Sequence, residues 1–281
     1  MANPHESSLT NHDPTLYHTH ANFVYSAKYT SPLFDLLSAQ PGESILDLGC
    51  GTGELTRQIK ALVGAGEVWG VDSSQDMLDH AASIDKDITY ICADIQKPEA
   101  LPASLAHKFD KIFSCATFHW CKTSPGGVLE SIKYLLKPGG KVVFEFGGFG
   151  NTLPARSGCH QVLKQEGVDP DTVDPWYFPT VKQYQTLLTA HGLTTLSLDL
   201  IPRPTPLPTD IVGWLSTFAR NTFFHQFDDG KAAQLLNEVQ EYCRPSSYWS
   251  TANPGCGTKG AEGGEDGWEI MYVRLRGVAQ V

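Results

Sequence analysis

Residues 43–54, which read ESILDLGCGTGE, join a short apolar run to three glycines at alternate positions. The apolar run, Ile45 to Leu48, has the length of a buried parallel strand, and a helical apolar pattern begins directly after the glycines. A strand, a glycine turn and a helix in this order bring backbone N–H groups and a helix N-terminus up to a ligand. Glycine is needed where a Cβ would block the ligand or forbid the backbone dihedrals. The segment therefore predicts an α/β sheet with a ligand-binding loop after this strand.

The loop also restricts the kind of ligand. It reads G-x-G-x-G and not the dinucleotide fingerprint G-x-G-x-x-G, and Asp47 stands on the strand itself. An acid at this place repels a pyrophosphate but can pair with an ammonium, while the helix N-terminus favours a carboxylate. The run DLGCGTG resembles the first motif of the class I S-adenosylmethionine (SAM) dependent methyltransferases. The resemblance implies SAM as cofactor, S-adenosylhomocysteine as product, and cofactor contacts from Asp47, Gly49, Cys50, Gly51 and Gly53.

Apolar runs alternate with amphipathic helical patterns along most of the chain. The further strands are expected at residues 67–71, 88–92, 109–115, 141–146, 194–200 and 268–277. Strands that alternate with helices predict a parallel sheet with right-handed crossovers. The resemblance implies a seven-stranded, Rossmann-like class I methyltransferase sheet. Its last strand is antiparallel and lies beside the sixth, and a helical insertion forms a lid.

Two further acids end successive predicted strands. Asp72 lies nineteen residues after Gly53 and can accept hydrogen bonds from ribose hydroxyls, although an Asp here could also cap the next helix. Asp94 ends the following strand. The resemblance implies that the Asp94 carboxylate binds the amino group of adenine and that the backbone N–H of Ile95 binds a ring nitrogen. The alternative is that Asp94 is an acid on the surface. The remaining predicted cofactor contacts are Tyr25, Ser73, Met77, Ala116 and Phe118.

The chain is long enough to bury a core without disulfides or metals. We expect residues 1–40 to hold a tail and a helix that covers the cofactor, and residues 41–150 to form the SAM-binding Rossmann-like core. Residues 151–281 are expected to complete the same domain with a helical substrate lid at about 205–250 and the final strand. Prolines 202, 204, 206 and 208 predict a stiff, extended connector before the lid.

Composition excludes several classes of partner. The formal net charge of −10 argues against nucleic acid, which favours a basic face. The N-terminal 30 residues lack an apolar signal region and no later run has the length of a membrane span. Seven scattered cysteines without C-x-x-C indicate a reducing compartment. His12, His18 and His20 lack the acidic or cysteine neighbours of a metal site. We expect a cytoplasmic monomer that binds no metal, nucleic acid or membrane.

The methyl acceptor is predicted to be a small molecule. Methyl transfer needs alignment and exclusion of water, and it needs a general base only when the acceptor is protonated. His119, at the end of the fourth strand, could be such a base or could only form a wall of the pocket. Arg220 could hold a carboxylate or carbonyl, or could be a solvated helix residue. The predicted substrate contacts are Tyr29, His119, Trp120, Trp214, Arg220 and Phe224.

Two segments suggest a narrower relationship. The HW pair at 119–120 and GWLSTFAR at 213–220 resemble the trans-aconitate methyltransferase-like branch, and overall likeness is highest to the fungal gliotoxin bis-thiomethyltransferases. That resemblance implies S-methylation of the thiols of a reduced epidithiodiketopiperazine in secondary metabolism. A carboxyl O-methyltransferase of the trans-aconitate type is the alternative, and Arg220 would matter more for it. A protein that binds SAM without methyl transfer is a third hypothesis.

Overall fold

The chain forms two compact units in a computed structural model that describes residues 26–252 and 265–281. The first, here called the sheet unit, contains the described residues up to Phe149 together with Trp176–Ile201 and Arg274–Val281. The second, here called the helical unit, contains Gly150–Pro175 and the described part of Pro202–Val273. The predicted segment 151–281 is thus divided between the two units, because some of its strands belong to the sheet unit.

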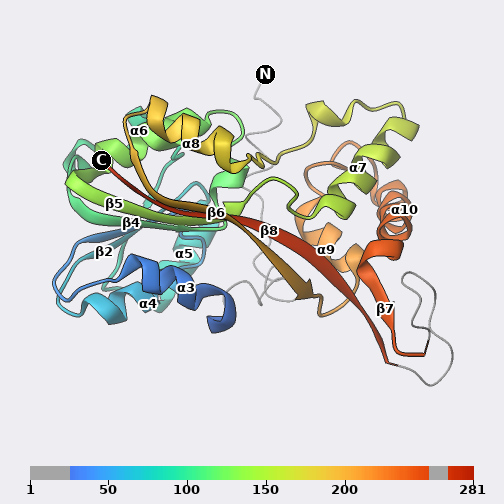
Figure 1. Ribbon diagram of the computed structural model, residues 1–281, viewed down its shortest axis with the longest axis horizontal. Helices are drawn as coiled ribbons and strands as arrows, with labels where there is room; N and C mark the ends of the chain where they lie inside the picture. The colour runs from blue at the N-terminus through green and yellow to red at the C-terminus, as the bar shows by residue number, and fades with distance from the viewer. Residues whose placement is uncertain (1–25, 253–264) are drawn as a thin grey trace. The chain divides into compact units, whose positions relative to one another are not determined.

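The sheet has the strand order β3-β2-β1-β4-β5-β8-β6, with β7 paired to β8 (Figure 1). The strands are β1 (Ile45–Leu48), β2 (Val68–Asp72), β3 (Thr89–Cys92), β4 (Phe109–Cys115), β5 (Leu136–Gly147), β6 (Thr194–Pro206), β7 (Tyr248–Ser250) and β8 (Asp266–Gln280). Strands β1 to β5 pair in parallel, and β8 runs antiparallel to β5 from Lys141↔Gln280 to Gly147↔Arg274. The predicted α/β fold with an antiparallel last strand beside the sixth is confirmed.

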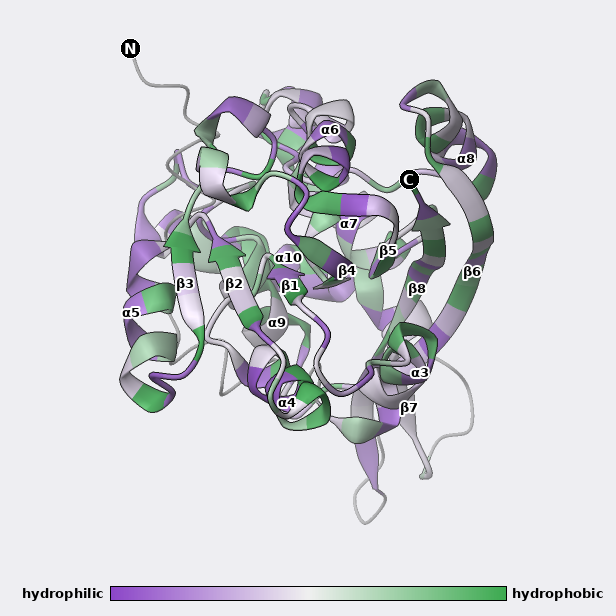
Figure 2. Ribbon diagram, turned by 90° about the vertical axis from the view of Figure 1, so that its left-hand side faces the viewer, coloured by the Kyte–Doolittle hydropathy of each residue, from purple (hydrophilic) through white to green (hydrophobic). Residues whose placement is uncertain are grey.

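Helices cover both faces of the sheet, as a parallel sheet requires. Figure 1 shows α3 and α4 on one side and α6 and α8 on the other. In β1, Ile45 packs in the core that includes α3 and α4, whereas Leu46 and Leu48 pack in the core that includes α6 and α8. Figure 2 shows β3, β2 and β1 side by side, with hydrophobic stretches in them. The helices of the sheet unit are α3 (Ala27–Leu37), α4 (Glu54–Val63), α5 (Gln75–Ile84), α6 (Pro125–Leu135) and α8 (Val181–Ala190).

The helical unit is built on three helices and a hairpin. The helices are α7 (Leu153–Gln165), α9 (Ile211–Phe218) and α10 (Asp229–Ser247). Gly158 allows α7 to approach α10 closely, since a Cβ there would lie 3.0 Å from Cγ1 of Val239. The short strand β7 pairs with the start of β8, with Tyr248 opposite Trp268. The sequence did not predict β7; three residues are too few to show an apolar period.

The proline-rich stretch is not a separate connector. Pro202, Pro204 and Pro206 all lie within β6, which ends at Pro206. The prediction of a connector is therefore wrong for these residues. Strand β6 is at the end of the strand order, where a proline on the outer side removes no ladder hydrogen bond. Within the described part of the chain, every helix is too short or too polar to cross a lipid bilayer.

Candidate cofactor site

The glycine loop between β1 and α4 adopts a backbone that other residues rarely reach. Gly49, Gly51 and Gly53 have φ values of 82°, 53° and 79°. A Cβ on Gly49 would lie 2.2 Å from Cγ2 of Thr117, which follows β4. The Thr117 hydroxyl donates to the Gly49 carbonyl at 3.1 Å. The loop is thus bent tightly against the end of β4, and its glycines are required by geometry.

Asp72 is fixed against this loop. Its carboxylate accepts the Gly51 N–H at 2.9 Å through Oδ2 and the Ser74 N–H at 2.9 Å through Oδ1. The cap of α5 is Ser74, whose Oγ accepts from the Met77 N–H. Two backbone donors therefore hold the Asp72 carboxylate in one orientation at the end of β2, and helix capping is left to Ser74.

Asp47 is a buried acid beneath the loop. Its side chain is only 2% exposed, and Oδ2 accepts the Thr56 hydroxyl at 2.6 Å. Burial raises the pKa of Asp47 to about 7, the Thr56 hydrogen bond lowers it, and the nearby Asp72 and Glu54 carboxylates raise it further. A buried carboxylate of this kind gains most from a cationic partner, which favours its ionised form. An ammonium group of a ligand would be such a partner.

Asp94 is tied to the residues that follow it. Its Oδ1 accepts the Gln96 N–H at 3.0 Å, and Lys97 Nζ lies 3.2 Å from Oδ2. The Gln96 side chain in turn accepts the Ser124 N–H at 2.9 Å, at the start of α6. Ile95 is buried, and its carbonyl accepts the Ser131 hydroxyl. Gln96 thus joins the end of β3 to α6, a role that sequence reasoning missed because the two partners are 28 residues apart.

The end of β4 carries a strained residue. Ala116 has φ 61°, and its N–H donates to the Glu145 carbonyl at 2.7 Å. Non-glycine residues at positive φ cluster at functional sites. Phe118 follows, but its ring packs against Phe144 and Phe146 in the core. The predicted cofactor contact of Phe118 therefore depends on its backbone and stays a prediction.

Aromatic side chains surround His119 in the sheet unit. The His119 ring lies 5.3 Å from Trp120 and 5.8 Å from Phe178 between centroids. Trp176 stacks on Phe178 at 5.5 Å and meets Trp120 edge-on at 6.2 Å. We call these four residues, His119, Trp120, Trp176 and Phe178, the aromatic cluster. The sequence predicted only His119 and Trp120 as site residues; the WYF run at 176–178 was the signal for the other two.

The remaining predicted contacts of the sheet unit are distributed around the loop and α3. Cys50 is buried within the loop, and Ser73 and Met77 lie between the end of β2 and the first turn of α5. Tyr29 is buried in α3. Tyr25 lies outside the described residues. The structure thus brings Asp47, Cys50 and Asp72 to one loop.

Three predicted substrate contacts lie in the helical unit. Trp214 is buried, and its Nε1–H donates to the Tyr272 hydroxyl at 2.6 Å. Phe224 is fully buried beside Phe223. Arg220 donates to the carbonyls of Phe224 and Phe227 and forms an ion pair with Asp229 at 2.7 Å. Its side chain therefore stabilises the turn before α10. It is thus not the solvated helix residue that was the alternative, and its substrate role stays a prediction.

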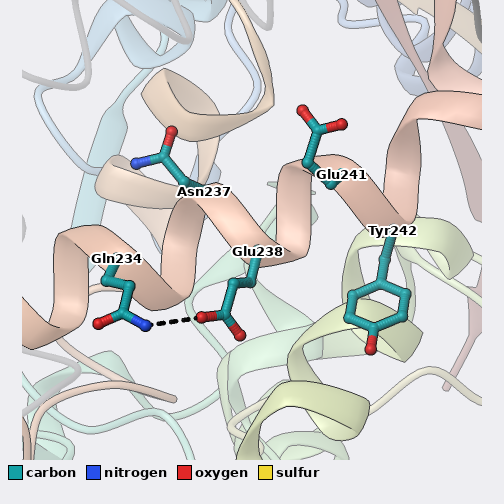
Figure 3. Close-up of a pocket in the computed structure, with 5 residues that line it drawn as sticks. All are labelled: Gln234, Asn237, Glu238, Glu241 and Tyr242. Atoms are coloured by element: carbon teal, nitrogen blue, oxygen red, sulfur yellow. Dashed lines mark hydrogen bonds between the residues drawn. The ribbon is translucent and has the colours of Figure 1, made fainter.

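A pocket of about 520 Å³ lies along α10 (Figure 3). Its described lining residues are Gln234, Asn237, Glu238, Glu241 and Tyr242. Gln234 donates to Glu238 at 2.9 Å. Among the described residues, none of those predicted to bind cofactor or substrate lines this pocket.

Comparison with known proteins agrees with this geometry. Residues 45–140 match the family described as "Methyltransferase domain". An uncharacterized methyltransferase of Schizosaccharomyces pombe, C70.08c, is 29% identical over 94% of this chain and 95% of its own length. Malonyl-[acyl-carrier protein] O-methyltransferase of Pseudescherichia vulneris is 40% identical, but over only 39% of this chain and 43% of that enzyme. The chain thus matches less than half of that enzyme's length.

Solved structures share the fold at low sequence identity. YcgJ of Bacillus subtilis has a TM-score of 0.58 and 13% identity, covering 91% of this chain and 98% of YcgJ. Phosphoethanolamine N-methyltransferase 2 of Haemonchus contortus, solved with S-adenosylhomocysteine, has a TM-score of 0.51 and 15% identity, covering 95% of this chain and 56% of that one. The [4+2]-cyclase SpnF has a TM-score of 0.54 and 16% identity, covering 90% and 80%. Given the glycine loop, the strand order and these matches, the chain is a SAM-dependent methyltransferase with the class I α/β fold.

Proposed function

We propose that SAM is held by the glycine loop and by the three acids at the strand ends. Asp47 would bind the ammonium group, Asp72 the ribose hydroxyls, and Asp94 with the Ile95 backbone the adenine. The observation that carries this proposal is the buried Asp47 beneath a loop that has no room for a Cβ at Gly49. Bound there, SAM supplies a methyl group on a positively charged sulfur.

Replacement of Asp72 tests the proposed ribose contact. We expect Asp72→Ala to weaken SAM binding by about 1.5–3 kcal/mol, the scale of hydrogen bonds to a charged group, or roughly 10- to 150-fold. The measurement is isothermal titration calorimetry. Since Asp72 also accepts the Gly51 N–H, circular dichroism and thermal unfolding must show that the variant is folded. An unchanged dissociation constant in a folded variant would remove Asp72 from the site.

The acceptor is proposed to be a small molecule with thiol groups, best represented by a reduced epidithiodiketopiperazine. A thiol with a pKa near 8.5 ionises with little help, so a site without a strong base can methylate it. The aromatic cluster beside the end of β4 suits a planar or apolar molecule. The resemblance of the chain to the fungal dithiol methyltransferases supports this choice.

A carboxylate is the second candidate acceptor. It is ionised at neutral pH and needs no base. The observation that favours it is the similarity of part of the chain to malonyl-[acyl-carrier protein] O-methyltransferases, which spans less than half of each protein.

A panel of acceptors separates these candidates from a SAM-binding protein that transfers no methyl group. The protein is incubated with SAM and, in turn, a dithiol, a carboxylic acid, a phenol and an amine, and the products are analysed by mass spectrometry. We expect S-adenosylhomocysteine and a methylated dithiol. A methylated acid would favour the second candidate. Tight SAM binding without S-adenosylhomocysteine for any acceptor would contradict methyl transfer.

A further inference from the structure

We infer that the binding of SAM removes a proton from Asp47, so that the affinity for SAM falls as the pH falls below neutral. The inference rests on the proposed function and adds a regulation of the same site by pH. A cation at the glycine loop would be the charge partner that this buried acid lacks in the ligand-free protein. The observation that carries the inference is the contrast between Asp47 and the other buried acids.

Three acidic side chains are buried in the part of the chain that the structure describes, and two of them have a guanidinium partner. The Glu145 carboxylate accepts from Nε of Arg276 at 2.7 Å. The Asp174 carboxylate accepts from Nε of Arg156 at 2.7 Å. Asp47 forms no ion pair with a described residue. A buried carboxyl group either gains a cationic partner or takes up a proton and becomes neutral.

The groups closest to Asp47 do not compensate its charge. Among the described residues, its hydrogen bond comes from the neutral hydroxyl of Thr56 in α4, at 2.6 Å. Asp72 at the end of β2 and Glu54 in α4 are acids, and both raise the pKa of Asp47 by repulsion. The Cys50 thiol in the loop is neutral, because burial raises its pKa. Ionised Asp47 would thus be a third negative charge in this part of the molecule.

The described residues of the other elements that pack here supply no cation either. Tyr90 in β3 is neutral, because burial raises its pKa. The Arg57 guanidinium of α4 donates to a backbone carbonyl of the loop at 3.1 Å. Lys28 in α3 lies over the ring of Tyr29, and β4 places a phenylalanine opposite Asp47. The ligand-free protein therefore favours the neutral acid, and burial raises the pKa of Asp47 to about 7.

A cation at the glycine loop reverses this balance. The Asp72 carboxylate accepts the Gly51 N–H of the loop and is close enough to raise the pKa of Asp47. A positive charge bound at the same loop acts with the opposite sign and favours ionised Asp47, with or without direct contact. SAM carries two positive charges, on its ammonium and its sulfonium. When SAM binds, the Asp47 proton passes to the solvent, and no bond of SAM is made or broken.

The affinity for SAM should follow the ionisation of Asp47. With a pKa of about 7, Asp47 is about 9% ionised at pH 6 and about 50% ionised at pH 7, while the amino group of SAM stays mostly protonated at both. We expect SAM to bind about 5-fold more weakly at pH 6 than at pH 7. Asp47→Asn has no proton to lose, so its affinity should differ by less than about 1.5-fold between these pH values. Equal wild-type affinity at both would overturn the inference.

Calorimetry in buffers of different ionisation enthalpy counts the protons released on binding. At pH 6 we expect about 0.9 proton per SAM bound in the wild-type protein and less than about 0.2 in Asp47→Asn. Asp110→Asn is the matched control, since hydrogen bonds lower the pKa of that acid, and it should release as many protons as wild type. Binding without proton release would overturn the inference and leave the proposed SAM site in place. No binding of SAM at any pH would contradict the proposed function and the inference together.

Thr56→Val assigns the proton to Asp47. The variant keeps the shape of the side chain but removes the hydroxyl whose hydrogen bond lowers the pKa of Asp47. Loss of such a bond weakens the acid on the order of tenfold. Proton release at pH 7 should therefore rise from about 0.4 to about 0.8 per SAM bound, and Thr56→Ser should restore the wild-type value. Circular dichroism shows that the variants are folded. Unchanged proton release in folded Thr56→Val would overturn the assignment to Asp47.

Discussion

Asp47→Asn is expected to make the ligand-free protein more stable at pH 8 while weakening SAM binding at least 10-fold. The loss of affinity follows from the proposed contact with the SAM ammonium, since a hydrogen bond to a charged group contributes about 1.5–3 kcal/mol. The gain in stability follows from burial. At pH 8 the folded wild-type protein buries an ionised carboxylate, whereas the variant buries a neutral amide, which costs less free energy. Asn keeps an oxygen that can accept the Thr56 hydroxyl.

The sign of the pH dependence follows from the pKa of Asp47, which burial raises from 3.8 to about 7. Between these values the folded protein binds a proton that the unfolded chain has released, so stability falls as the pH rises from about 4 to 7. The penalty at pH 8 is at most about 4 kcal/mol. The advantage of Asp47→Asn should therefore be about a third of its full size at pH 5 and should grow toward pH 8.

Denaturant unfolding of the two proteins at several pH values measures this effect. Asp110→Asn is the matched control, because its expected effect on stability has the opposite sign. Asp110 is partly desolvated, but its hydrogen bonds to Lys137 and to the Ser44 N–H lower its pKa. That substitution should therefore destabilise the protein at pH 8 and have less effect as the pH falls. A loss of stability in Asp47→Asn at pH 8 would contradict the account of Asp47.

Gly49→Ala is expected to be the most damaging single substitution in the cofactor loop. The residue has φ 82°, and the new Cβ would lie 2.2 Å from Cγ2 of Thr117. Positive φ costs a non-glycine residue about 1–2 kcal/mol, and overpacking adds about 1–3 kcal/mol. Because the strain can be relieved only by moving the loop, we expect SAM affinity to fall by more than 100-fold together with a loss of stability.

Two further variants separate the cost of the backbone conformation from the cost of the contact with Thr117. Gly42 has a similar φ of 85°, but nothing lies within 4 Å of a Cβ placed there, so Gly42→Ala should lose only the stability that the backbone conformation costs and should keep SAM affinity. Adding Thr117→Ala to Gly49→Ala removes the side chain that the Cβ meets and should recover part of the stability. Wild-type affinity in Gly49→Ala would show that the loop does not need glycine at this position.

The sheet and the glycine loop could be predicted from the sequence because both depend on patterns of neighbouring residues. Ile45 to Leu48 reads as a buried strand, and each of the acids Asp47, Asp72 and Asp94 lies in or directly after a predicted strand. The carboxyl ends of parallel strands meet at one edge of a sheet, so their order along the chain was enough to predict a common site.

The features that the sequence missed depend on partners far apart in the chain. Nδ1 of His119 accepts the N–H of Gly147, which lies 28 residues later, and no local sequence pattern predicts that hydrogen bond. The alternative of a solvated helix residue is wrong for Arg220, because its guanidinium donates to carbonyls beyond the end of α9. The prolines of β6 resembled a connector because a strand tolerates prolines only at the edge of a sheet. Whether a strand lies at the edge depends on the order of all the strands and cannot be seen in its own sequence.

A crystal structure of the protein with S-adenosylhomocysteine would show where the cofactor binds. We predict the nucleoside at the carboxyl ends of β1, β2 and β3, with the ribose hydroxyls at hydrogen-bond distance from Asp72 and the amino group beside Asp47. Density for the ligand at another place, or none at saturating concentration with Asp47 still sealed beneath the loop, would contradict it.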